Sequence, residues 1–469
     1  MKILFILPCV SSKYYELDYH HGIAQLSSVL KMAGHATELI ILSTVDSDSI
    51  KNKLKDFKPD ILAYSFTSDN AELAKQIMQH TKQFGIFTIS GGIHTTMEPL
   101  DIISCCDAVC IGEGEDAFRD LAGGKHIEEI SNIWYQKDGT VFKNKMRPFI
   151  EDLDTLPFSD RTVFDYQKSL DQDHRADFMA GRGCPFHCTY CANDGLRNLA
   201  EGRYVRWHSP EYIIEEIKRV ISDYTGVESI CFQDDTFALK KSWLQEFVSL
   251  YKLQIGMPFI CNLRIGAVNE NIVDLLAKAG CTEVRIGVEQ GNEELRRMIL
   301  RRNMDNREII KTFEWIKKAG IKVFAYNMVG VPGETKETIE ETIRLNQQIE
   351  PDKLHVSMFR PYPGTALYDR CIDDSLVTSE STLSYFEPVS TVQLPTISKS
   401  DLEYYFRIFR VAVLFPRLRP IASVLAKCKL GKKKTLYDVL YESALHVYFL
   451  LRSKLPEWIK RPLFRIIKA

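Results

Sequence analysis

The stretch Gly181-Arg182-Gly183-Cys184-Pro185-Phe186-His187-Cys188-Thr189-Tyr190-Cys191 carries three cysteines, separated by three and then by two residues. It follows the apolar run Phe178 to Ala180, which predicts a β-strand, so the cysteines lie on a glycine-rich loop at a strand end. Three thiolates this close in sequence can converge on one metal centre. Thiolates favour zinc or an iron–sulfur cluster.

The choice between zinc and a cluster depends on a fourth ligand. Structural zinc takes four protein ligands, but no second Cys-x-x-Cys or nearby His pair follows, and His187 is the only histidine inside the loop. Cys231, Cys261 and Cys281 fall on or beside later predicted strands and are expected in the core. A [4Fe–4S] cluster held by three cysteines leaves one iron open to a small molecule, as a reaction centre requires. We therefore favour the cluster.

Strand-like runs alternate with helical segments downstream of the cysteines. The runs are Ser229 to Phe232, Phe259 to Ile265, Glu283 to Glu289, Lys322 to Val329 and Lys353 to Phe359. With the strand before the cysteines they make six. A βα unit repeated in this way predicts a parallel barrel or partial barrel with its active site at the carboxyl ends of the strands.

Polar residues stand at several of these predicted strand ends. They are Gln233, Asp234, Asp235, Asn262, Arg264, Glu289, Gln290, Asn292 and Asn327. We expect them to face one cavity. The alternative is that they cap or start the next helix, as Asp234 and Asn292 could.

The first 125 residues predict a doubly wound α/β domain. Five apolar runs, at residues 3–7, 36–42, 61–66, 86–89 and 108–111, have helical segments between them. Ligands of such sheets bind at the carboxyl ends of the strands, where the residues Ser65, Thr67, Ser90, Gly91, Gly92, His94, Thr95, Gly112 and Glu113 fall. No Gly-x-Gly-x-x-Gly follows the first strand and no Walker loop occurs, which argues against dinucleotide and nucleoside triphosphate ligands. The Gly91-Gly92 pair could also be a tight turn.

The cysteine spacing, with Tyr190 before the last cysteine, resembles the cluster motif of the radical S-adenosylmethionine (SAM) superfamily. Four further segments resemble members that carry an N-terminal cobalamin (B12)-binding domain: Arg206 to Glu211, Ile286 to Glu289, Gly330 to Thr335 and Arg360 to Thr365. The resemblance implies a partial (β/α)₆ barrel whose Cys184, Cys188 and Cys191 hold a [4Fe–4S] cluster. It further implies reductive cleavage of SAM to a 5′-deoxyadenosyl radical, cobalamin as second cofactor, and methylation of an unactivated carbon.

The resemblance also assigns residues to the two cofactors. It implies SAM contacts for Tyr190, Asp234, Asn262, Arg264 and Glu289. The corrin of cobalamin is expected to rest on the strand ends of the N-terminal domain, at the nine positions from Ser65 to Glu113 given above.

One departure concerns the lower ligand of cobalt. Cobalamin proteins of the mutase type carry Asp-x-His-x-x-Gly, whereas Asp18-Tyr19-His20-His21-Gly22-Ile23 has its glycine one place early. We interpret that string as the entry to a helix. Cobalt is therefore expected without a lower histidine ligand, with His94 the nearest histidine candidate.

Three alternatives remain for the function. A radical SAM oxidative cyclase or another radical rearrangement would use the same cofactors without methyl transfer. Methylthio transfer would need a second cluster in the N-terminal domain, but the spacings of Cys9, Cys105, Cys106 and Cys110 do not fit one. The non-enzymatic alternative is a sensor that binds cobalamin or a cluster.

The domain boundaries follow from these patterns. We predict a Rossmann-like (flavodoxin-like) cobalamin-binding domain at 1–130, a hairpin and linker at 131–174, a radical SAM partial barrel at 175–395, and a basic helical region at 396–469. The hairpin is predicted from the Asp138-Gly139 turn.

Composition and charge limit the class of protein and the partners to be expected. The 469 residues are 45% hydrophobic and 26% charged, as in ordinary globular proteins. Residues 401–469 hold 15 Lys and Arg against 5 Asp and Glu, whereas the whole chain has a net charge of −2. The basic helical region therefore suits either an anionic membrane surface or a helical cap with a solvated charged face.

The expected partners and location follow from the same patterns. No cleavable signal or membrane-spanning run is apparent, so we expect a cytoplasmic protein, peripheral on the inner face of the membrane if the basic region binds lipid. The partners expected are a small-molecule or lipid-like substrate and a one-electron reductant such as flavodoxin or ferredoxin. No nucleic acid is expected, because the main body is acidic.

Overall fold

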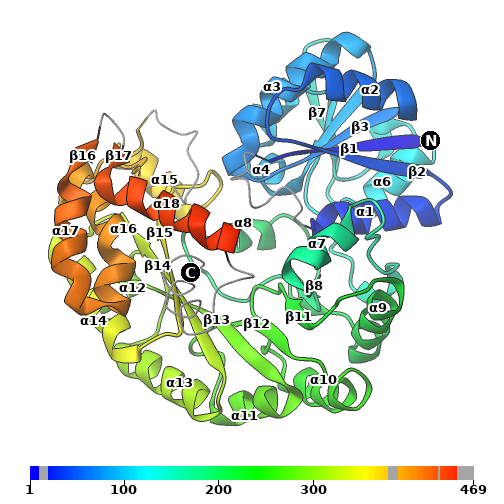
Figure 1. Cartoon of the computed structure of the whole chain (residues 1–469). Coiled ribbons are helices and arrows are strands. Elements are labelled where there is room, and N and C mark those ends of the chain that lie inside the picture. Colours follow the sequence, from blue (N-terminus) through cyan, green and yellow to red (C-terminus); the bar gives the residue numbers. More distant parts are fainter. Residues whose placement is uncertain (10–18, 379–388, 431–433, 452–469) are drawn as a thin grey trace.

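The computed structural model describes residues 1–9, 19–378, 389–430 and 434–451, with side chains as far as Ser443. An N-terminal α/β domain lies above an open barrel, and the C-terminal helices lie along the left side of the barrel in the view of Figure 1. The α/β fold class is thus confirmed. Asp18 of the string before the first helix, and the basic tail from residue 452, lie outside the described residues.

The N-terminal domain is built on one seven-stranded sheet, in the order β2-β1-β3-β4-β5-β6-β7. The strands are β1 (Lys2–Pro8), β2 (Ala36–Leu42), β3 (Ile61–Ser65), β4 (Phe87–Gly91), β5 (Ala108–Cys110), β6 (Ile133–Lys137) and β7 (Thr140–Lys143). The helices are α1 (His21–Met32), α2 (Ser47–Phe57), α3 (Ala71–Thr81), α4 (Gly92–Met97), α5 (Pro99–Ile103) and α6 (Glu115–Ala122). β1 to β5 are parallel, and all but the edge strand β2 are largely buried, which explains their continuous apolar runs.

The sheet is larger than the sequence predicts. The hairpin β6–β7 forms around Asp138-Gly139 as predicted, but β6 pairs antiparallel with β5 and so extends the sheet. The predicted boundary at residue 130 therefore cuts through the sheet. A turn motif fixes a hairpin locally, whereas its pairing with a distant strand depends on the tertiary fold.

The barrel is a six-stranded, all-parallel sheet in the order β15-β14-β13-β12-β11-β8. Its strands are β8 (Arg175–Phe178), β11 (Ser229–Phe232), β12 (Phe259–Leu263), β13 (Cys281–Glu289), β14 (Lys322–Val329) and β15 (Lys353–Met358). Its helices are α9 (Pro210–Asp223), α10 (Lys241–Gln254), α11 (Glu270–Ala279), α12 (Glu293–Met298), α13 (Asn306–Lys318), α14 (Lys336–Ile349) and α15 (Ala366–Asp373), with α7 (Tyr166–Asp173) before β8. The outer strands β15 and β8 do not pair with each other, so the barrel is partial.

The strand before the cysteines ends earlier than predicted, at Phe178 instead of Ala180. Beyond it the Ala180 amide donates to Asp234 (2.9 Å), and the Ala180 carbonyl accepts from the His208 amide (2.9 Å). These bonds turn the chain out of the sheet. The next residues form a separate two-stranded ladder of β9 (Gly181–Arg182) and β10 (Arg206–Trp207).

The C-terminal region is helical, as predicted, over its described residues. It comprises α16 (Lys399–Leu414), α17 (Arg419–Lys427), a short hairpin of β16 (Lys429–Leu430) and β17 (Lys434–Thr435), and α18 (Leu436–Leu451). α16 packs against α14 and β15. Among the described helices, none is both long and apolar enough to cross a membrane.

Candidate functional site

The cysteine loop, residues 184–191, leaves the β9–β10 ladder at the carboxyl end of the barrel. Gly183 has a φ of +84°, and a Cβ there would lie 2.6 Å from the Tyr204 carbonyl oxygen, so only glycine fits. All three thiols are free, with Cys188 buried and the other two partly exposed.

Hydrogen bonds from outside fix the shape of the cysteine loop. The Thr189 amide donates to the Leu300 carbonyl (3.2 Å), and the Thr189 carbonyl accepts from the Leu367 amide (2.8 Å). The Arg197 guanidinium donates to the Cys184 carbonyl (2.5 Å). His187 pairs with Asp194, which leaves it a loop residue on the exposed side.

The donor set fits an iron–sulfur cluster. Within the described residues, no three His, Cys, Asp or Glu side chains form a group that could hold one metal ion, and the three loop cysteines are included in that finding. Three thiols on one loop suit a cluster, in which each cysteine binds a different iron. Burial raises the pKa of the Cys191 thiol to about 11, so this sulfur needs cationic iron to stay ionised.

Two arginines flank Cys188. The Arg264 Nη1 atom donates to the Cys188 sulfur at 3.0 Å, and the guanidinium lies 3.9 Å from the centre of the Phe186 ring. The Arg302 Nη1 atom lies 3.9 Å from the same sulfur. Guanidinium donors stabilise negative charge on a ligating thiolate.

Arg302 also belongs to a polar triad. It donates to the Tyr190 hydroxyl (3.1 Å), which donates to the Glu289 carboxylate (3.2 Å), and Arg302 lies 3.8 Å from that carboxylate. Burial raises the pKa of Glu289, although Arg302 opposes the shift. Sequence reasoning missed Arg302, because it follows a helix instead of a strand.

The backbone holds Glu289 in an unusual position. Its φ is +66°, in the left-handed region, and the pairing of β13 with β14 shifts register beside it. The side chain folds back over Gly287, where a Cβ would lie 2.1 Å from the Glu289 Oε1 atom. Gly287 is therefore required for the triad.

The other predicted SAM contacts have mainly structural partners. Asp234 accepts from the Ala180 amide, and Asn262 donates to the Asp234 carbonyl (2.8 Å). Burial raises the pKa of Asp234 to about 7. Asn327, expected to face the cavity, is instead fully buried and bonded to Asn346 of α14.

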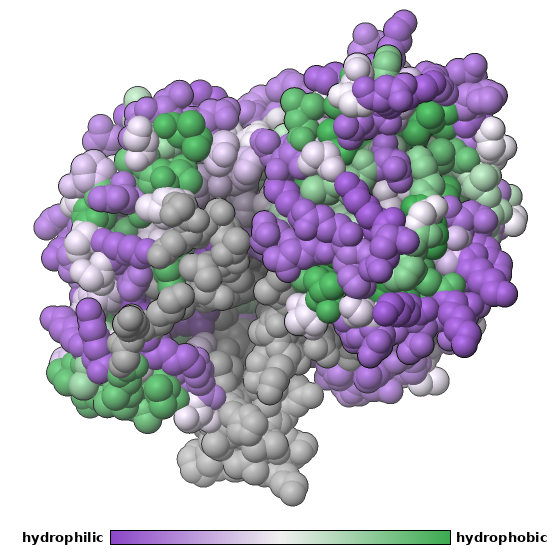
Figure 2. Space-filling view, turned by 90° about the horizontal axis from the view of Figure 1, so that it is seen from above, coloured by the Kyte–Doolittle hydropathy of each residue, from purple (hydrophilic) through white to green (hydrophobic). Residues whose placement is uncertain are grey.

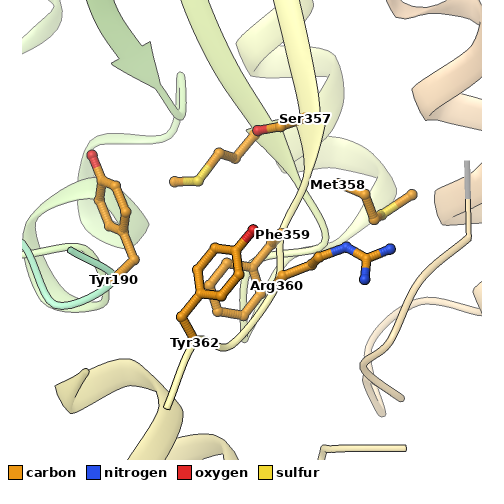
Figure 3. Close-up of a pocket in the computed structure, with 7 residues that line it drawn as sticks. Tyr190, Ser357, Met358, Phe359, Arg360 and Tyr362 are labelled. Atoms are coloured by element: carbon orange, nitrogen blue, oxygen red, sulfur yellow. The ribbon is translucent and has the colours of Figure 1, made fainter. Parts of the chain in front are cut away.

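A pocket of about 160 Å³ opens beside the cysteine loop, lined by Tyr190, Met328, Ser357, Met358, Phe359, Arg360 and Tyr362. Figure 3 shows the Tyr190 ring on one side, the Tyr362 ring near the middle, and Arg360 extending away from Tyr190. The volume is below the roughly 300–1,000 Å³ typical of small-molecule sites, so it would hold one part of a ligand.

The candidate cobalamin residues gather at the carboxyl ends of β3, β4 and β5, here called the binding edge. Ser90 and Thr95 are buried and bonded to each other (2.7 Å), and the Gly112 amide donates to Thr96 (3.1 Å). Gly92, with a φ of +87°, lies so close to Ser65 that a Cβ would be 2.9 Å from its hydroxyl. Ser65, Gly91 and the exposed Thr67 complete the edge.

His94 lies on the binding edge but has partners of its own. Its Nδ1 atom is 3.0 Å from the Ser68 hydroxyl and its Nε2 atom 3.4 Å from Asp101. Burial lowers its pKa, which favours neutral imidazole. Both ring nitrogens thus lie near protein groups.

Glu113 was predicted to contact cobalamin, but its carboxylate joins the two domains. It accepts from Arg182 (2.8 Å) and from two nitrogens of Arg206 (2.9 and 3.0 Å). Although burial raises it, these arginines hold the pKa of Glu113 below its ordinary value. This partnership could not be predicted from local patterns, because both arginines lie in the other domain.

Two further contacts bring the binding edge to the barrel mouth. Tyr362, after β15, donates to both carboxylate oxygens of Asp69 (3.1 Å each), next to the end of β3. Met97, at the end of α4, fills the space beside Gly364 and beside Gly195 of α8 (Ala192–Arg197). A Cβ at either glycine would lie 2.5 Å from the methyl group of Met97. The binding edge and the cysteine loop therefore lie at the same end of the barrel.

Family comparisons agree with this two-part site. Residues 12–122 match the model of the B12 binding domain, and residues 179–345 match that of the radical SAM superfamily. The chain thus carries a B12-binding domain and a radical SAM domain. The second match contains all three cysteines, and the first contains the binding edge.

Two curated relatives are similar to this chain over most of its length. An uncharacterized methyltransferase of Pyrococcus horikoshii is 27% identical over 90% of this chain and 93% of its own. The anaerobic magnesium-protoporphyrin IX monomethyl ester cyclase of Rubrivivax gelatinosus is 25% identical over 83% and 73%.

Solved structures show the same fold. The cobalamin-dependent SAM radical enzyme OxsB matches 96% of this chain and 75% of its own, with a TM-score of 0.69 and 16% identity. The radical SAM methyltransferase TsrM of Kitasatospora setae matches 80% and 75%, with a TM-score of 0.65 and 14% identity.

Proposed function

We propose that this chain is a cobalamin-dependent radical SAM enzyme that methylates an unactivated carbon. The observation that carries the proposal is that two sites meet: the loop with Cys184, Cys188 and Cys191 lies at the mouth of the barrel, and the Tyr362–Asp69 bond holds the binding edge at the same mouth. The family matches and the methyltransferase among the relatives support it.

The cofactors are a [4Fe–4S] cluster, SAM and cobalamin. When bound, the cluster supplies the electron that cleaves SAM to methionine and a 5′-deoxyadenosyl radical, and cobalamin supplies a carrier for the methyl group. The three cysteines would hold the cluster, and Arg264 would stabilise the charge on Cys188. Tyr190 and Glu289, which contact Arg302, would offer hydrogen-bonding groups to SAM. Asp234 and Asn262, which are bonded to each other, are further candidates for SAM contacts.

On the binding edge, Gly91, Gly92 and Gly112 would offer backbone to the corrin, because positions without side chains let a flat ring approach closely. Ser65, Thr67, Ser90, His94 and Thr95 surround these glycines, and Glu113 acts through the domain interface. The ring nitrogens of His94 already lie near Ser68 and Asp101. His94 would therefore act through these protein contacts when cobalamin is bound.

The substrate is a small-molecule or lipid-like compound, since the pocket beside Tyr190 is lined mainly by aromatic and methionine side chains. A one-electron donor such as flavodoxin or ferredoxin reduces the cluster. The proposed location is the cytoplasm at the inner face of the membrane, where thiols stay reduced; all twelve cysteines are free.

A cyclase is the second candidate, favoured by the similarity to the Rubrivivax gelatinosus cyclase. Products formed from SAM by the anaerobically reconstituted, reduced protein separate the two. Methyl transfer yields S-adenosylhomocysteine as well as 5′-deoxyadenosine, whereas a cyclase yields 5′-deoxyadenosine alone. Absence of a corrin absorption band after gel filtration with cobalamin would refute the cobalamin part of the proposal.

A further inference from the structure

The outer face of α17 carries an unusual set of exposed apolar side chains. Leu418, just before the helix, is 48% exposed, Ile421 is 60% exposed and Val424 is 69% exposed. Their spacing of three residues places them on one side of the helix. Leu430 in the following hairpin is 48% exposed and extends this set, which we call the α17 patch.

The inner side of α17 is firmly attached to the protein. Ala422 and Ala426 are buried there. The Tyr404 hydroxyl of α16 donates to Ser423 (2.9 Å), and Arg419 forms an ion pair with Glu340 of α14. The α17 patch is therefore the exposed side of a helix whose other side is packed against the protein.

Basic residues accompany the α17 patch along the sequence. Residues 417–435 hold seven Lys and Arg and no Asp or Glu. Of these, Arg417, Lys427 and Lys429 are exposed, and Lys434 is exposed and paired with Glu442. Figure 2 shows hydrophobic residues beside hydrophilic ones at the left edge, the side on which Figure 1 places α17.

We propose that the α17 patch binds the surface of an anionic lipid membrane, with its apolar side chains among the acyl chains and its cations against the headgroups. Helices that lie in a membrane interface combine these two features. A symmetric dimer through the same face would bring equal sets of cations together, which disfavours self-association. The surface gives the proposed membrane location a physical basis and is independent of the radical chemistry.

Co-sedimentation of the full-length protein with vesicles tests the proposal. We expect binding to vesicles of phosphatidylcholine mixed with phosphatidylglycerol, little binding to phosphatidylcholine alone, and weakening by salt. The double variant I421S/V424S should weaken binding to the mixed vesicles by about tenfold, and K427Q/K429Q should do the same.

Leu253, which is 83% exposed at the end of α10, supplies the matched control, since L253S should bind as the unmodified chain does. Circular dichroism should show that I421S/V424S folds, because both replaced positions are exposed. Equal binding to neutral and anionic vesicles, or unchanged binding by I421S/V424S, would overturn the proposal. So would a dimer in light scattering that I421S/V424S alone abolishes, because it would make the patch an interface between copies.

Discussion

Arg206 donates hydrogen bonds of 2.9 and 3.0 Å to the two carboxylate oxygens of Glu113, and so ties the barrel to the B12-binding domain. Arg182, two residues before the first cysteine of the loop, shares the same carboxylate. The interface therefore fixes the binding edge and the cysteine loop relative to each other. A methyl carrier and a radical source that serve one substrate need such a fixed distance.

Replacing Glu113 should loosen this connection. In E113Q the buried Arg206 loses its counter-charge, whereas Arg182 keeps its ion pair with Glu115 (2.6 Å), and the expected cost is about 2 kcal/mol of stability. Hydrogen exchange followed by mass spectrometry should show faster exchange in residues 179–186. The control is E128Q, whose carboxylate lies 3.9 Å from exposed Lys137 and should matter little. Equal exchange in the two variants would show that Glu113 does not join the domains.

Gly287 should act on SAM binding through Glu289. In G287A the new methyl group would occupy the place of the Glu289 carboxylate, and SAM affinity of the reconstituted protein should fall about tenfold in calorimetry. Adding G287A to E289A should cause no further loss, because the displaced group is already absent. Additive losses would mean that Gly287 acts through something other than Glu289.

Arg264 should raise the reduction potential of the cluster. Its hydrogen bond to Cys188 stabilises the extra negative charge of the reduced state, so R264Q should lower the midpoint potential by about 50 mV. Arg302, whose guanidinium lies farther from the sulfur, gives a matched comparison: R302Q should shift the potential less. A redox titration followed by electron paramagnetic resonance measures both. A larger shift in R302Q would contradict the assignment.

Asp234 should make stability depend on pH. Burial raises its pKa from 3.8 to about 7. The folded state thus favours the protonated carboxyl group of Asp234. The stability that this preference contributes is fully present below pH 3.8 and is lost as the pH rises towards 7. D234N has no carboxyl group to ionise at this position and so avoids this loss. The free energy of unfolding of D234N minus that of the unmodified protein, measured with urea, should therefore increase by about 2 kcal/mol from pH 5 to pH 8. A constant difference across that range would show that Asp234 ionises normally.

Local patterns predicted much of the architecture. The apolar runs located β1 to β5 and the barrel strands to within a few residues, since parallel strands buried on both faces have a continuous apolar sequence. The cysteine loop was predictable because its ligands lie within one short stretch. The β6 pairing was missed, since it depends on a contact between distant segments.

The site residues, too, were predictable only where local sequence position indicates a role. Arg264 and Glu289 were predicted because they stand at strand ends, where a parallel barrel collects its functional groups. Basic residues near the C-terminal end of a helix usually interact with the helix dipole. Arg302 follows α12, so its position did not indicate a role in the site. Glu113 was placed on the correct edge, but its arginine partners lie 69 and 93 residues away in sequence.

The most direct measurement is 5′-deoxyadenosine formation from SAM by the anaerobically reconstituted protein after reduction with dithionite. The account predicts formation by the unmodified chain and by C428A, which replaces an exposed cysteine outside the site, and none by C188A. No 5′-deoxyadenosine from a protein with a complete cluster, or equal formation by C188A, would contradict the assignment as a radical SAM enzyme.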